Sequence, residues 1–214
     1  MKNVTGVRNS AISIYSQIAR ENYRNLLAVK SQLQVIEEKI SAPGDGDKEK
    51  EFELMKLEGE INKCISIVIV FSAIAVEAYI YDYVSRNLSD AFVKNYLDKL
   101  DPVSKWVIIP RLVIGKELPR EHRWFDILKK LIKQRNRLVH EKSFSPPVKI
   151  EDAIEYFKKA QNHTAIVYDT AREAIELLDL LIGEMKSLDP SEVGWIDSYL
   201  APNSDNPFRL LEVP

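Results

Sequence analysis

Residues 135–140 read RNRLVH and bring an arginine, an asparagine and a histidine together just before the Ser-Phe-Ser-Pro-Pro stretch at 143–147. A histidine that titrates near neutral pH can remove a proton from a ribose 2′-hydroxyl or donate one to the leaving 5′-oxygen. An arginine offers a rigid fork of donors that stabilises the extra negative charge on phosphorus in the transition state. The asparagine can orient the imidazole or hold a phosphate oxygen. This set of side chains suits RNA cleavage without a metal ion.

Helix geometry limits how these side chains can meet. At about 100° per residue, Asn136 and His140 share one face, whereas Arg135 and His140 are about 140° apart around the axis. Arg135 can reach the histidine by wrapping its side chain round the helix, by local unwinding at the helix end, or by meeting His140 of a second subunit. In a two-fold dimer, two arginines and two histidines would face one another across a shared groove. The structural alternative is that the helix dipole alone favours basic residues and histidine in the last turn.

The charge of the chain is unevenly distributed. The net charge is only −2, but residues 105–142 contain eleven Lys and Arg against four Asp and Glu. This asymmetry predicts an anionic partner near the basic segment, with a solvated basic helix face as the open alternative. The candidates to follow an RNA backbone are Lys129, Lys130, Lys133, Arg137 and Lys142.

Apolar periodicity predicts an all-α fold. Apolar residues alternate three and four apart through 12–40 and again from Leu54 to Ala78, so two narrow seams should pair as a long antiparallel hairpin. Further helices are expected from Ser89 to Leu100, at 121–142 and from about 151 to 188, and the stretch SKWVIIPRLVIGKELPREHR (104–123) should form only one or two helical turns and a loop. The expected architecture is an antiparallel helical bundle with a long N-terminal helical hairpin.

Composition limits the class of protein further. We expect residues 1–188 to form a single domain and residues 189–214 to form an irregular tail. The lone Cys64 lies in an apolar run and should be a core side chain, and three scattered histidines imply neither a metal nor a cofactor. The N-terminus lacks the apolar run of a signal peptide, and the apolar stretch 64–76 is too short to span a bilayer. These features predict a cytoplasmic protein that does not enter a membrane.

The RNRLVH stretch and its surroundings resemble the HEPN superfamily (higher eukaryotes and prokaryotes nucleotide-binding domains). These helical bundles carry an R-x4–6-H motif, usually with a polar residue after the arginine, and residues 135–140 match it. The runs FSAIAVEAYIYDYV (71–84) and SKWVIIP (104–110) look like the central helix and the Trp/Pro connector of prokaryotic HEPN-like proteins. The resemblance covers about residues 50–185.

The resemblance implies a metal-independent endoribonuclease of the kind found in toxin–antitoxin and phage-defence systems, with a homodimer placing both motifs in one cleft. By position, Arg135 would stabilise the phosphate, His140 would be the acid and base, and Asn136 would support them. Glu77 on the central helix would anchor Arg135, with a structural ion pair or a solvated face as the alternatives. The implied partners are a second copy of the chain, RNA, and an antitoxin or another partner protein.

Two other functions stay open on the sequence alone. One is a non-catalytic helical dimer that binds nucleotide, RNA or a partner protein and keeps the motif as a structural element. The other is a coiled-coil scaffold built on the N-terminal hairpin. Exposure of His140 in a cleft beside Arg135 of either subunit would leave catalysis possible, whereas burial of that side chain against Leu or Val would favour the binding module.

Overall fold

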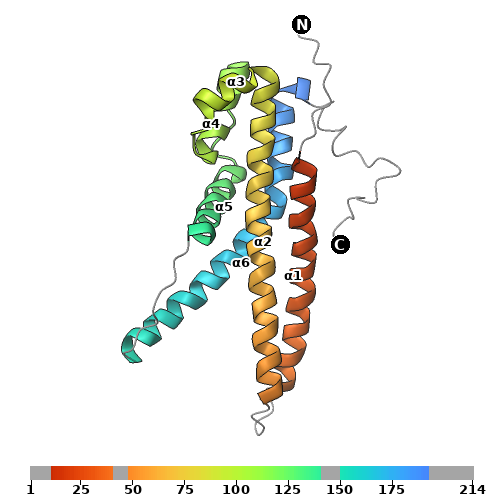
Figure 1. Ribbon diagram of the computed structural model, residues 1–214, viewed down its shortest axis with the longest axis vertical. Helices are drawn as coiled ribbons and strands as arrows, with labels where there is room; N and C mark the ends of the chain where they lie inside the picture. The colour runs from red at the N-terminus through yellow and green to blue at the C-terminus, as the bar shows by residue number, and fades with distance from the viewer. Residues whose placement is uncertain (1–10, 41–47, 141–149, 193–214) are drawn as a thin grey trace, which may run out of the picture.

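The computed structural model describes residues 11–40, 48–140 and 150–192 (Figure 1). The described secondary structure is entirely helical, which confirms the predicted all-α class. The elements are α1 (Ile12–Ile40), α2 (Lys48–Asn87), α3 (Asp90–Phe92), the π-helical turn η1 (Val93–Leu97), α4 (Pro102–Ile114), α5 (Arg123–His140), α6 (Ile150–Leu188) and the 3-10 turn η2 (Pro190–Glu192).

Helices α1 and α2 run side by side in opposite directions and form the predicted long hairpin (Figure 1). The apolar seam joins them, with Ala19 and Leu26 of α1 buried and Cys64 and Val68 of α2 buried. Cys64 is therefore the core side chain that its apolar surroundings predict, and burial raises the pKa of its thiol above the ordinary value. The seam pattern of three and four accounts for this pairing.

Helix α2 is the centre of the bundle, because it packs against α1, α4, α5 and α6. Its buried residues surround the helix from Cys64 to Ser85, as expected for a segment that is apolar on most sides. By length and composition α2 is the one described helix that could cross a membrane, and 56% of its most apolar window is buried inside the bundle. That burial favours the interpretation of this segment as a core helix of the bundle.

The segment after residue 101 differs from the prediction. Instead of one or two turns cut by Pro110, α4 runs unbroken from Pro102 to Ile114 and contains that proline. Pro110 is buried beside Ile109 in the apolar side of α4, so burial of its ring compensates for the backbone hydrogen bond that a proline cannot make. Gly115 then ends α4 in the left-handed conformation, with φ of 71°.

Asp101 and Ser89 begin the two short helical segments that cover one end of α2. The Ser89 hydroxyl accepts a hydrogen bond from the Phe92 amide, which confirms its predicted N-cap role. Asp101 caps α4 by accepting from the Ser104 amide at 3.1 Å and from the Ser104 hydroxyl, and Pro102 follows at the first helical position. The Asp101-Pro102 pair therefore ends one segment and starts the next.

Replacing Asp101 with asparagine should change the acid dependence of stability. The hydrogen bond from the Ser104 hydroxyl is the main reason that the pKa of Asp101 lies below its ordinary value of 3.8. A carboxylate with a lowered pKa stabilises the fold above the unfolded pKa and loses that contribution as the pH falls through the folded pKa. We expect wild type to exceed Asp101→Asn in urea stability by a constant margin above about pH 5, and the margin to shrink towards pH 3. A margin that grows on acidification would contradict this role.

The first residues of the predicted tail pack against the bundle. Asp189 is buried and accepts a hydrogen bond at 3.0 Å from the Tyr83 hydroxyl of α2. It also accepts from the amide and hydroxyl of Ser191 at the start of η2. The rest of the tail, from residue 193, lies outside the described residues.

Helix α6 packs on α2, α5 and α1 through its C-terminal part. Figure 1 shows its N-terminal part leaving the bundle beyond the end of α5. Among the described side chains of α6, the buried stripe begins at Val167 and continues through Ala171 and Ala174, and Thr164 is exposed. The side chains of α6 before residue 164 lie outside the described ones.

Candidate functional site

The orientation of α5 is set by one apolar side. Its buried residues are Trp124, Ile127, Leu128, Leu131, Ile132 and Gln134, and the helix packs with this side on α2, α4 and α6. Leu138 continues the same side near the helix end and packs against the core. The angle between each other residue of 135–140 and this buried side, measured around the helix axis, decides whether its side chain is buried or exposed.

Arg135 lies on the buried side of α5. It follows Leu128 and Leu131 at seven and four residues, so it occupies a position of the apolar stripe. Its side chain is 22% exposed, and its Nη2 donates to Glu77 Oε1 of α2 at 2.7 Å. The buried Nε has no hydrogen-bond partner among the described residues. Glu77 thus contacts Arg135, and this ion pair compensates for a cation placed on an apolar surface.

Asn136 and His140 lie on the opposite, exposed side of the same helix. α5 remains helical through His140, so the described structure contains no unwinding that would turn the imidazole towards Arg135. The arginine does not wrap round the helix either, because Glu77 holds it against α2. Of the three routes by which Arg135 could meet His140, contact with a second subunit is the one that this conformation leaves available.

The basic residues of α5 fall into two groups. Lys129 pairs with Asp126 at 2.8 Å, which lowers the pKa of that carboxyl, and lies over the Phe125 ring. Lys130 pairs with Glu173 of α6 at 3.3 Å. Lys133 and Arg137 are exposed, and neither has an ion-pair partner within the described part of the chain.

Lys133, Asn136, Arg137 and His140 therefore share one side of the helix. Their spacing of three and four residues places them within an arc of about 100°. All four side chains are exposed. From the sequence alone, the five basic residues are equally good candidates to bind RNA. In the structure, ion pairs engage Lys129 and Lys130 but neither Lys133 nor Arg137, and Lys142 lies outside the described residues. Within the described chain, the exposed side of the last turns of α5 thus presents two unpaired cations, an amide and an imidazole.

Removing one member of the Glu77–Arg135 pair should destabilise the fold more than removing both. With Glu77→Gln alone, the arginine stays part-buried without its carboxylate, and we expect a loss of about 1–2 kcal/mol. Arg135→Met alone leaves the Glu77 carboxylate part-buried without its arginine, whereas the double variant leaves no unpaired charge at this contact. A double-mutant cycle from urea unfolding should give a coupling energy above about 0.5 kcal/mol. Strict additivity would mean that the contact contributes nothing.

His122, the other histidine whose side chain is described, does not join the site. His122 precedes α5 and its Nδ1 lies 2.7 Å from Glu184 Oε1 of α6. No arginine lies at the motif spacing before it, so it serves as a natural control for His140.

Comparisons with known proteins identify no relative of this chain. Neither a family model, nor a curated protein, nor a solved structure matches this chain.

Proposed function

We propose that this chain is a metal-independent endoribonuclease of the HEPN type that acts as a homodimer. The observation that carries the proposal is the exposed His140 at the end of α5, beside Asn136 and two cations unpaired within the described chain, with Arg135 held against α2 five residues earlier. An imidazole in water beside phosphate-binding cations is suited to proton transfer on RNA. The exposure of His140 to solvent supports this proposal.

Each residue has a defined role in the proposed reaction. His140 of one subunit takes the proton of the ribose 2′-hydroxyl, and the 2′-oxygen attacks the adjacent phosphorus. The bond to the 5′-oxygen breaks, and that oxygen leaves with a proton supplied by the second histidine or by water. The products are a 2′,3′-cyclic phosphate and a 5′-hydroxyl. Arg135 of the other subunit stabilises the charge on the phosphoryl oxygens, and Asn136 positions the imidazole or a phosphate oxygen.

The ion pair with Glu77 is compatible with a phosphate-binding arginine. A guanidinium group has five donors, and the hydrogen bond to Glu77 uses Nη2. Anchoring one edge of the fork reduces the freedom that the arginine would lose on binding a phosphate. Lys133 and Arg137 would hold neighbouring phosphates, so RNA binding should weaken steeply with salt.

The second candidate is a non-catalytic dimeric module that binds nucleotide, RNA or a partner protein. One observation favours it: Glu77 already neutralises Arg135 within the chain, as in a purely structural ion pair. In this function the basic side of α5 would bind its ligand without cleavage. A toxin–antitoxin or phage-defence setting, with an antitoxin as partner, belongs to the ribonuclease proposal.

Cleavage of total RNA in excess EDTA tests the ribonuclease proposal. The wild-type protein is incubated with RNA, and the product ends are mapped by their susceptibility to a kinase and to a phosphatase that removes cyclic phosphates. We expect fragments with cyclic-phosphate and 5′-hydroxyl ends. Intact RNA, combined with salt-dependent RNA binding in a filter assay, would instead support the non-catalytic module.

A further inference from the structure

The far half of the α1–α2 hairpin is covered less well than the rest of the bundle. It extends away from α3, α4 and the packed part of α6 towards the C-terminal end of α1 and the N-terminal end of α2 (Figure 1). Here the seam residues Leu33 and Ile36 of α1 and Leu57 of α2 are only partly buried, whereas Leu26, nearer the bundle, is fully buried. Two helices alone cannot bury both sides of their contact, so this part of the seam is open to a further partner.

One side of this open segment is a groove between the two helices. Its lining includes Ala28, Gln32, Val35 and Ile36 from α1 and Glu53 and Leu57 from α2. Val35 is 48% exposed although it is apolar. The groove thus has an apolar floor and a polar rim, the pattern of a surface that receives another helix.

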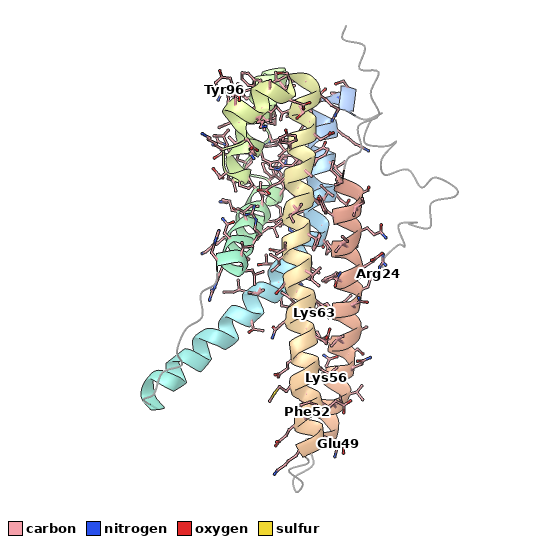
Figure 2. The ribbon with its side chains drawn as sticks, viewed as in Figure 1. Arg24, Glu49, Phe52, Lys56, Lys63 and Tyr96 are labelled. Atoms are coloured by element: carbon pink, nitrogen blue, oxygen red, sulfur yellow. The ribbon has the colours of Figure 1, made fainter. Side chains whose placement is uncertain are left out.

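Acidic and basic side chains lie on both halves of the groove, with Glu60 between Lys56 and Lys63 along α2. Figure 2 shows Arg24 and Lys63 on the part of the hairpin nearer the bundle, Lys56 and Phe52 further along, and Glu49 at the N-terminal end of α2. Glu53 lies in the groove near the N-terminal end of α2, and Glu38 is exposed near the C-terminal end of α1. Exposed acids and bases that lie at equal distances on either side of one level of the hairpin make this surface complementary to an antiparallel copy of itself.

We propose that this groove binds the same groove of a second copy of this chain, with the two hairpins antiparallel and stacked face to face as a four-helix bundle. A two-fold axis at the level of Ser31 in α1 and residue 58 in α2 stacks each helix on its symmetry mate. Lys56 then lies opposite Glu60 of the second copy, and Lys63 lies opposite Glu53, because the members of each pair are equally distant from the axis along α2. The same axis places Arg24 opposite Glu38 at the rim.

The four charged positions of α2 are accessible for this exchange. Glu60 and Lys63 contact each other at 3.2 Å with exposed side chains, and such a surface pair is too weak to oppose a new partner. Stacking the two hairpins also covers Val35, Ile36 and Leu57, which supplies the apolar burial that charge pairs alone do not give.

This association is independent of the proposed ribonuclease. It uses the far ends of α1 and α2, whereas the proposed catalytic dimer uses the exposed end of α5. A substitution in the groove should therefore weaken the association through the hairpins and leave the rate of RNA cleavage by the α5 dimer unchanged. A variant of the α5 motif should do the reverse.

A charge exchange within α2 tests the interface. Lys56→Glu places like charges opposite Glu60 at two symmetric positions, and we expect self-association in sedimentation equilibrium to weaken by roughly tenfold or more. Glu60→Lys alone should weaken it by a similar factor. The double variant K56E/E60K restores opposite charges across the axis and should recover association close to that of wild type. Met55→Glu, at a 69% exposed position of α2 outside the groove lining, is the matched control and should leave association unchanged.

Three results would overturn the proposal. The first is a wild-type chain that stays monomeric up to its solubility limit, which would leave the groove to a different protein. The second is an association that neither single variant weakens, as expected if only the α5 interface forms. The third is a double variant that associates no better than the single ones, which would show that Lys56 and Glu60 do not face each other.

Discussion

Replacing His140 with alanine is expected to lower the rate of RNA cleavage at least about 100-fold, the range for losing a general acid or base. The side chain is exposed at the end of α5, so its removal takes away no core contact. The melting temperature should therefore stay within the error of wild type, which separates a loss of chemistry from a loss of fold. The rate is best measured with a fluorescently labelled RNA in EDTA under single-turnover conditions.

The chain supplies its own control for this experiment. His122→Ala removes an exposed histidine that contacts Glu184 rather than the α5 motif, and cleavage should continue at the wild-type rate. A fully active His140→Ala protein would exclude this histidine from the chemistry and move the assignment to the non-catalytic module.

Replacing Trp106 with alanine should destabilise the fold far more than breaking the Glu77–Arg135 ion pair does. Trp106 is fully buried on α4 and stacks on Tyr79 of α2, with ring centroids 5.5 Å apart and an interplanar angle of 25°. Removing a buried indole leaves a cavity and breaks the contact between the two helices, so we expect a loss of about 3–5 kcal/mol in urea unfolding.

Phenylalanine at the same position distinguishes packing from hydrogen bonding. The indole Nε1 is buried and has no hydrogen-bond partner among the described residues, so its loss should carry no penalty. Trp106→Phe keeps an aromatic ring against α2 and should cost less than about 2 kcal/mol. If phenylalanine cost as much as alanine, the indole would have to act through its N–H group rather than through packing.

The helices that depend on local pattern could be predicted from the sequence. The spacing of apolar residues three and four apart in 12–40 and from Leu54 onward predicted both helices of the hairpin. Ser89 marked a helix start because its hydroxyl can accept a hydrogen bond from a backbone amide of the first turn. The helical path through Pro110 could not be predicted in the same way. A proline breaks a helix locally, and only the burial of its ring in the bundle offsets that cost.

For the candidate site, the positions of the side chains around the axis of α5 could be predicted from the sequence, but their ion pairs with other helices could not. The separation of Arg135 from His140 around α5 follows from the spacing alone, and extending the stripe from Leu128 and Leu131 would have placed the arginine on the buried side. The pairing of Lys130 with Glu173 joins α5 to α6, so no local pattern distinguishes Lys130 from Lys133, which has no such pair in the described chain. Selecting the cations available to a phosphate therefore required the tertiary structure.

The assembly of the catalytic pair across two subunits is the central claim, and a mixed dimer tests it most directly. Arg135→Gln retains a side chain that can hydrogen-bond Glu77, and His140→Ala leaves the arginine intact. Each homodimer should be inactive, so the two variants are co-expressed with different tags and the heterodimer is purified. A heterodimer that regains up to about half of the wild-type cleavage rate, through its one complete pair, is the predicted result. An inactive heterodimer beside an active wild type would show that each chain builds its site alone.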